Sequence, residues 1–284
     1  MTPQPVLDDW QPRAVEAMSG SPVGPPSVPG VTALAYFFWD DDRIHSRFFT
    51  IECAFLATRK WCGALPCILV VNRTTPRIVA FCEANQIAIQ IDPTLTGGVP
   101  RMNIDCVETL HSRFQTDQVL LIQSDGFPLR EGLSEFAGRY DYLGPPWGPP
   151  SWYTRLVFPH SRFSVGNGGF SLRSKRICEM SSHYYRKVFR LLPYGYWLAD
   201  DVYYAKTMPR FVPACRKTLK YAPPDVAGRF AFESNRSYNP PEGTLPFGFH
   251  SAIGFRELLK DFGPQIADPA SLDRQAADAN SGAN

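Results

Sequence analysis

Four short apolar runs alternate with segments of helical periodicity along the first half of the chain. The runs are VTALAYFF at 31–38, CILVVN at 67–72, IAIQI at 87–91 and VLLIQ at 119–123. Between them, the segments 44–60, 76–84 and 102–114 read as helices. Such alternation requires right-handed crossovers between parallel strands. It predicts an α/β fold with a mainly parallel central sheet and helices on both faces.

The ends of the first and fourth runs are where this fold would place a ligand, because ligands of parallel sheets gather at the carboxyl ends of the strands. The residues there are Tyr36, Phe37, Phe38, Trp39 and Asp40 after the first run, and Gln123, Ser124 and Asp125 after the fourth. We therefore expect these two groups to border one cleft. The second half of the chain is irregular and rich in Pro and Trp.

The expected boundaries follow from changes in composition. Residues 1–30 hold seven prolines and are expected to form an arm without a long helix or a central strand. Residues 31–262 are expected to form one domain. Residues 263–284 drift to Ala, Asp, Asn and Ser, which is typical of a flexible tail.

The net charge and the cysteines of the chain indicate which binding partners and which cellular compartment to expect. A formal net charge of +2 leaves no excess of cations for a nucleic acid, so we expect no nucleic-acid partner. No apolar run is long enough for a transmembrane segment and no signal peptide is visible, so we expect a cytoplasmic protein. The seven cysteines are scattered and mostly apolar in setting, which predicts buried free thiols in a reducing compartment.

Asp125 is the first candidate functional residue, because the apolar strand VLLIQ ends close to it. A hard cation held by one or two carboxylates could neutralise the diphosphate of a sugar nucleotide. The alternative is that Asp125 only caps a turn. His250, in PFGFH at 246–250, is a second candidate metal ligand. Its alternative role is that of a half-buried, hydrogen-bonded side chain.

A glycine-rich turn and an acidic pair supply the other candidates. In SVGNGGFSLRSKR at 164–176, the glycines around Asn167 allow positive φ angles and a close approach of ligand to main chain. The alternative is a tight turn before a helix. Asp200 and Asp201 could complement the dipole of a helix, or one of them could accept a proton from an acceptor hydroxyl in an aromatic setting. Asp200 is the candidate base.

These motifs occur in an order that resembles a known family. QSD, NGGFSLR, an acidic pair followed by Val202, and FGFH resemble a family of GT-A glycosyltransferases that is described as a domain of unknown function. The resemblance covers about residues 31–255. A Gly-Gly segment followed by an acidic cluster is also distantly similar to β-1,4-galactosyltransferases and polypeptide N-acetylgalactosaminyltransferases.

The resemblance implies a GT-A (Rossmann-like) fold and a hexosyltransferase-like enzyme of glycan or polysaccharide biosynthesis. It implies a nucleotide-sugar donor, with a UDP-sugar as first guess, and a divalent metal, Mn²⁺ or Mg²⁺. It assigns donor binding to Tyr36, Phe37, Phe38, Trp39, Asp40, Gln123, Ser124, Asn167, Gly168 and Gly169. It assigns the metal to Asp125 and His250, and catalysis to Asp200 and Asp201. Gln123 stands where many GT-A enzymes have the first Asp of the DxD motif.

The segment 143–163 lies where GT-A folds place acceptor loops. Trp147, Trp152 and Tyr153 could stack on a sugar, or they could pack a rigid loop. Arg155, Arg162 and Arg173 could pair with phosphate. The functional hypothesis is an inverting, metal-assisted sugar transfer, with retaining transfer open. The alternative is a non-catalytic nucleotide-sugar or carbohydrate-binding module. A metal-dependent hydrolase is disfavoured, since neither GxSxG nor HExxH is present.

Overall fold

A six-stranded sheet forms the centre of the computed structural model, which describes residues 5–21, 23–38, 47–147, 152, 156, 165–191, 195, 198–233 and 243–266. The strand order is β3-β2-β1-β4-β6-β5. Their bounds are β1 Val31–Phe37, β2 Cys67–Val71, β3 Ile87–Ile91, β4 Gln118–Ile122, β5 Tyr142–Leu143 and β6 Ser171–Ser174. The first four strands are parallel, whereas β6 runs antiparallel to both β4 and β5. The mainly parallel sheet is confirmed.

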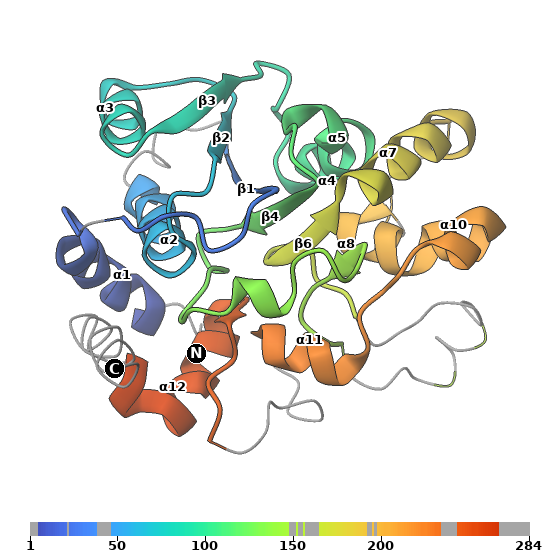
Figure 1. Ribbon diagram of the computed structural model, residues 1–284. Coiled ribbons are helices and arrows are strands. Elements are labelled where there is room, and N and C mark those ends of the chain that lie inside the picture. Colours follow the sequence, from blue (N-terminus) through green and yellow to red (C-terminus); the bar gives the residue numbers. More distant parts are fainter. Residues whose placement is uncertain are drawn as a thin grey trace.

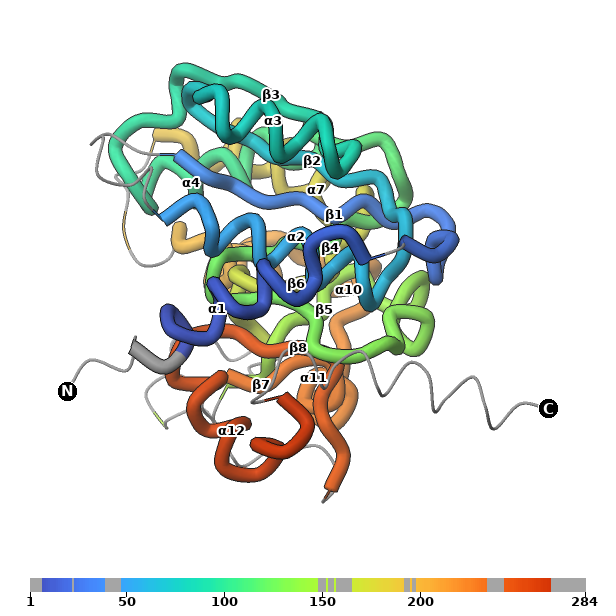
Figure 2. The backbone as a smooth tube through the Cα atoms, turned by 90° about the vertical axis from the view of Figure 1, so that its left-hand side faces the viewer, coloured from blue at the N-terminus to red at the C-terminus, as the bar shows by residue number. Residues whose placement is uncertain are grey.

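Helices cover both faces of this sheet. Helix α2 (Phe48–Cys62) lies on one face with α3 (Pro76–Ala84), and α4 (Val99–Glu108), α5 (Leu110–Arg113) and α7 (Lys175–Tyr184) lie on the other (Figures 1 and 2). The helix expected over 102–114 is two helices that meet at Thr109. The hydroxyl of Thr109 bonds the backbone oxygen of Asp105, at 3.1 Å, which favours a break in the helix there.

The amino-terminal segment is a packed helix, so the expectation of an arm without a long helix is wrong. Helix α1 spans Pro5–Met18 and contains Pro12. It packs on α2 and on α12 (Ala252–Ile266), and the indole of Trp10 donates to the backbone oxygen of Ile266 at 2.7 Å. The reason is its apolar face, whose buried side chains offset the cost of an internal proline. They are Leu7, Trp10, Ala14 and Met18. We propose residues 5–266 as one domain.

Short elements complete the second half of the chain. They are η2 (Leu133–Glu135), η3 (Tyr185–Phe189), α8 (Asp200–Val202), η5 (Tyr203–Thr207), α9 (Met208–Phe211), α10 (Pro213–Thr218), α11 (Pro224–Phe230), β7 (Ala231–Phe232) and β8 (Gly248–Phe249). All seven cysteines are buried and free, as expected. No helix in the described ranges combines the length and apolar character that crossing a bilayer requires.

Candidate functional site

A cavity of about 370 Å³ opens at the carboxyl ends of β1 and β4. Its position matches the rule for parallel sheets, and it brings together the two groups of residues that the sequence placed at one cleft. The lining residues are Leu7, Asp8, Gln11, Tyr36, Phe37, Arg47, Thr50, Ile51, Val99, Met102, Gln123, Ser124, Asp125 and Ala252. Phe38 is half-buried and is not part of this lining, and Trp39 and Asp40 lie outside the described residues.

Tyr36 forms a fixed wall of this cavity. Its hydroxyl donates to Oδ2 of Asp105 at 2.7 Å, and Arg113 binds the same carboxylate. Burial, followed by the charges of its neighbours, raises the pKa of Tyr36 far above its usual value. The phenol therefore stays protonated, and Tyr36 can pack against a ligand without exchanging a proton with it.

The glycines of the turn make room for side chains of the protein itself. A Cβ on Gly168 would lie 2.3 Å from Oδ2 of Asp200, and one on Gly169 would lie 2.0 Å from Nε2 of His250. Neither glycine has a positive φ, so that part of the expectation is wrong; Asn167 has the left-handed angle instead, at 60°. The side-chain oxygen of Asn167 stabilises the turn by accepting from the backbone N–H of Gly169 at 3.1 Å.

Asp125 and His250 meet where the cavity borders the glycine turn. Nε2 of His250 lies 4.0 Å from Oδ1 of Asp125, whose side chain is 40% exposed. Gln123 is their neighbour, because its Oε1 would lie 2.7 Å from a Cβ on Gly169. The chain brings His250 there by extending from β8, and the backbone N–H of Ser251 donates to the backbone oxygen of Asp125 at 2.7 Å.

These side chains could supply part of a metal site, with further ligands coming from outside the protein. Within the described ranges, no group of three or more His, Cys, Asp or Glu side chains is arranged to hold a metal on its own. One carboxylate and one imidazole are nevertheless a suitable protein contribution when diphosphate oxygens and water supply the remaining ligands, as is usual for Mg²⁺. The amide oxygen of Gln123 is a neutral donor beside them.

Glu233 is a site residue that the sequence reasoning missed. Its Oε1 accepts from the side-chain amide of Asn167 and lies 3.5 Å from Nδ1 of His250, without the alignment of a good hydrogen bond. Burial opposes the charged form of His250, but Glu233 and Asp125 more than offset this and raise its pKa. Glu233 directly follows the apolar residues Ala231 and Phe232, and this strand-then-acid pattern is the signal that could have identified it.

Asp200 is engaged in a buried ion pair. The guanidinium of Arg173, whose side chain is fully buried, donates to Oδ2 of Asp200 and to the backbone oxygen of Gly168 at 3.3 Å. The rings of Tyr142 and Tyr204 lie 5.4 and 4.6 Å from this guanidinium. Arg173 therefore holds Asp200, and its burial disagrees with the expected phosphate contact. Arg155 and Arg162 lie outside the described residues.

Asp201 has the properties of a proton acceptor. Burial, and next the negative charge of Asp200, raise the pKa of its carboxyl to about 6. Its Oδ1 accepts from the backbone N–H of Val202 at 2.7 Å, which orients the carboxylate. A carboxylate whose pKa is about 6 is a stronger base than an ordinary aspartate and is still largely ionised at neutral pH. Asp201 can therefore take a proton from a hydroxyl group more readily than an ordinary aspartate can.

Of the expected acceptor-side aromatics, the structure describes Trp147 and Trp152. Trp147 packs against Gly166, where a Cβ would lie 1.9 Å from the indole, and Nζ of Lys206 lies 3.9 Å from the centre of the same ring. The indole ring of Trp147 is thus in contact with other groups of the protein itself. Trp152 is 77% exposed and does not line the cavity at the carboxyl ends of β1 and β4. Tyr153 lies outside the described residues.

Three solved glycosyltransferases are similar to this chain. GlyE of Streptococcus pneumoniae TIGR4, in its apo form, matches at 12% identity with a TM-score of 0.45, over 77% of this chain and 53% of GlyE. Mouse xyloside xylosyltransferase 1, also apo, matches at 12% identity with a TM-score of 0.49, over 78% of this chain and 97% of that one.

The third structure is the mannosyltransferase PcManGT from Pyrobaculum calidifontis, in complex with GDP-Man and Mn²⁺. It matches at 15% identity with a TM-score of 0.40, over 98% of this chain and 84% of that one. This chain thus spans about half the length of GlyE, at 53%. No curated protein matches the chain.

A family model matches residues 102–250, a range that contains QSD, NGGFSLR, the acidic pair and FGFH. The matched range is more than half of the 284 residues. The chain belongs to the family described as "Protein of unknown function (DUF5672)".

Proposed function

We propose that this protein is a glycosyltransferase that moves a sugar from a nucleotide-sugar donor to an acceptor hydroxyl. One observation carries the proposal: Asp125 belongs both to the cavity at the carboxyl ends of β1 and β4 and to the cluster around the glycine turn. A donor with its nucleotide in the cavity would place its diphosphate beside Asp125. Its sugar would then lie against the turn that separates His250 from Asp200.

Asp201 is the proposed base. Its carboxylate takes the proton from the acceptor hydroxyl while the hydroxyl oxygen forms a bond to the anomeric carbon. The bond from that carbon to the diphosphate breaks, and the nucleoside diphosphate leaves with the electron pair. The ion pair with Arg173 holds the Asp200 carboxylate in place, and the charge of Asp200 in turn raises the proton affinity of Asp201. The pair therefore acts as base and positioning residue rather than as two equivalent acids.

The donor side has a comparable division of labour. Tyr36 and Phe37 offer aromatic surface for the nucleotide base, and Gln123 and Ser124 offer polar groups at the end of β4. Asp125 and His250 would hold a divalent metal, Mn²⁺ or Mg²⁺, that supplies charge neutralisation to the departing diphosphate. Gly168 and Gly169 would back the donor sugar. A UDP-sugar is the first donor to test, and a glycan or glycoconjugate is the proposed acceptor class.

The direct test is a donor panel. Purified protein is mixed with UDP-, GDP-, dTDP- or CMP-sugars, with and without Mn²⁺, and both the melting temperature and the release of nucleotide are measured. A donor that binds the native state must raise the melting temperature. We expect one donor class to bind and to be consumed slowly even by water. Donor that binds but is never consumed, with any metal or acceptor tried, would support a non-catalytic binding module instead.

Stereochemistry is tested on the product. A base at Asp201 serves a single in-line displacement, which inverts the anomeric configuration. The anomeric configuration of donor and product can be read by NMR from the coupling of the anomeric proton. Inversion supports the role of Asp201, whereas retention removes it while leaving sugar transfer itself intact.

A further inference from the structure

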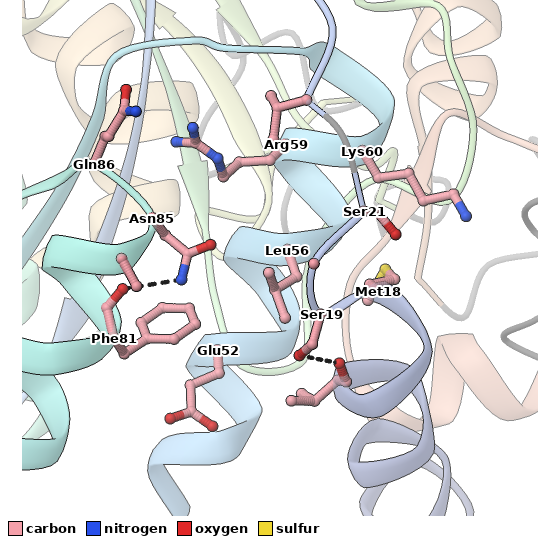
Figure 3. Close-up of a pocket in the computed structure, with 14 residues that line it drawn as sticks. Met18, Ser19, Ser21, Glu52, Leu56, Arg59, Lys60, Phe81, Asn85 and Gln86 are labelled. Atoms are coloured by element: carbon pink, nitrogen blue, oxygen red, sulfur yellow. Dashed lines mark hydrogen bonds between the residues drawn. The ribbon is translucent and has the colours of Figure 1, made fainter.

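A second cavity, of about 620 Å³, lies between helices α1, α2 and α3 and shares no lining residue with the site at the sheet edge. Figure 3 shows α2 as its floor, with the carboxyl-terminal parts of α1 and α3 as its two sides. Leu56, Phe81 and Met18 provide apolar lining, and Arg59, Gln86 and Ser21 provide polar groups. The cavity therefore combines an apolar surface with a small number of polar groups, as ligand sites do.

Arg59 is a buried, positively charged side chain that lines this cavity. The residue is only 7% exposed, and its Nε is buried without a hydrogen-bond partner. No oxygen within the described part of the chain accepts a bond from this guanidinium. Its chain extends from α2 into the cavity, toward Asn85 and Gln86 (Figure 3). A buried guanidinium without a counterion is costly for a folded protein, so an anion in the cavity would remove an existing penalty.

The neighbouring side chains do not neutralise Arg59. Glu52 also lines the cavity, but both of its oxygens bind Arg77, at 3.0 and 2.7 Å. The thiol of Cys67 is a hydrogen-bond partner of the Arg59 side chain, but burial raises its pKa to about 11, so it stays uncharged and supplies no counterion. The positive charge of Arg59 is thus without a counterion among the described residues that line the cavity.

We propose that the cavity between α1, α2 and α3 binds a small organic anion, with its carboxylate or phosphate group on Arg59 and its apolar body against Leu56 and Phe81. The forked donors of an arginine match the paired oxygens of both anions. The amide of Gln86 and the hydroxyl of Ser21 are available to a polar substituent of the ligand. The site is separate from the proposed sugar-transfer site, and its occupancy can be measured without any enzyme activity.

Calorimetric titration of the full chain tests the proposal. The probes are phenyl phosphate, benzoate and inorganic phosphate, with benzyl alcohol as the uncharged analogue. We expect at least one aromatic anion to bind more tightly than inorganic phosphate, and benzyl alcohol not to bind. Phenyl phosphate and benzoate differ only in the anionic group, so their ratio identifies which anion the site takes. Failure of every anion to bind would overturn the proposal.

Variants locate the binding. Arg59→Met keeps the length of the side chain and removes its charge, and we expect at least a tenfold loss of affinity for the aromatic anion. Arg139→Met removes an exposed arginine elsewhere and should bind as the unaltered protein does. Equal affinity in Arg59→Met would show that the probe binds at another place, and the assignment would fall.

Thermal melting separates a ligand site from a structural arginine. Without ligand, Arg59→Met should melt at the same or a higher temperature, because the substitution removes an unpaired buried charge. Saturating aromatic anion should raise the melting temperature of the unaltered protein and leave that of Arg59→Met unchanged. A lower melting temperature for ligand-free Arg59→Met would mean that Arg59 stabilises the fold itself, and would contradict the proposal.

Discussion

Two buried clusters of charged groups, one around Arg113 and one around Arg173, differ in how their aspartates are paired. Around Arg113, the guanidinium binds Asp92 and two oxygens of Asp105, and Tyr36 donates to Asp105 as well. Around Arg173, the guanidinium binds Asp200, while Asp201 accepts, within the part of the chain that the structure describes, only the backbone N–H of Val202. Each cluster holds one arginine and two aspartates, but both aspartates bind the arginine in the first cluster, whereas Asp201 has no bond from Arg173 in the second.

The pKa values of the aspartates reflect this difference in pairing. Burial would raise the pKa of Asp92, but its bonds with Arg113 and Thr94 lower it to about 2. Burial and the charge of Asp200 raise the pKa of Asp201 to about 6. A matched cluster stabilises the fold, whereas an unmatched acid costs stability and is typical of a functional site. The predictions below test this difference.

The largest expected effect is on turnover in Asp201→Asn. Loss of the proposed base should lower kcat by about 10²- to 10⁴-fold, the usual contribution of general base catalysis. Nucleotide release with the donor found in the panel measures it. Asp225→Asn, an exposed acid on α11, is the matched control and should keep full turnover. Undiminished turnover in a folded Asp201→Asn protein would remove Asp201 from the mechanism.

The same variant should be more stable than the unaltered protein at neutral pH. Because the pKa of Asp201 is raised to about 6 in the folded state, stability is lost as the pH rises from the unfolded-state pKa near 4 to about 6, and the full cost remains at higher pH. Asp201→Asn should then gain about 1 to 3 kcal/mol at pH 7. The gain should disappear below about pH 4, where an aspartate is protonated in both states. Urea unfolding at the two pH values measures it, and a loss of stability at pH 7 would contradict the account.

The cluster around Arg113 should lose stability when its arginine is removed, the opposite of the gain expected for Asp201→Asn. Arg113→Met leaves the carboxylate of Asp105, whose side chain is 1% exposed, without its counterion. The free energy of unfolding should fall by about 3 to 5 kcal/mol. The exposed Arg176→Met serves as control and should change it by less than about 0.5 kcal/mol. A small effect of Arg113→Met would mean that the two clusters do not differ as proposed.

Gly169→Ala should weaken the donor side of the site. The new methyl group would lie 2.0 Å from Nε2 of His250, so the ring must leave its present position beside Asp125. We expect affinity for metal and donor to fall by about 10- to 100-fold, as when the support of a metal ligand is lost. Gly263→Ala, where a Cβ meets nothing within 4 Å, is the control. Unchanged donor affinity would separate His250 from donor binding.

The smallest effect is a shift of a pH profile in Asp200→Asn. Removing the negative charge of Asp200 lowers the pKa of Asp201, so the acidic limb of the profile should move toward lower pH by about one unit. Turnover of Asp200→Asn above pH 7 should fall as well, because the substitution removes the ion pair between Arg173 and Asp200. An acidic limb that stays in place would show that Asp200 does not set the proton affinity of the base.

Local pattern sufficed to predict the sheet and its helices. The four apolar runs become β1 to β4, because burial on both faces of a parallel sheet imposes continuous apolar segments. The cavity at their carboxyl ends follows from the same geometry. Pro12 disfavours a helix in the first segment on local grounds, but the tertiary burial of Trp10 outweighs this poor helix residue.

Long-range pairing is the part that local pattern could not predict. Arg173 and Asp200 are 27 residues apart, and their contact depends on β6 and α8 lying side by side. The sequence favoured Asp200 over Asp201 as base, since nothing local reveals which acid is paired. Glu233 was missed for the same reason, because only the folded chain brings it to His250.

The pH dependence of kcat/KM between pH 4.5 and 8 is the most direct test of the central claim that Asp201 takes the acceptor's proton. The account predicts activity that rises with pH through a midpoint near 6, where this carboxyl loses its own proton, and a residual rate without that midpoint in Asp201→Asn. A flat profile over this range, or the same midpoint in both proteins, would contradict it.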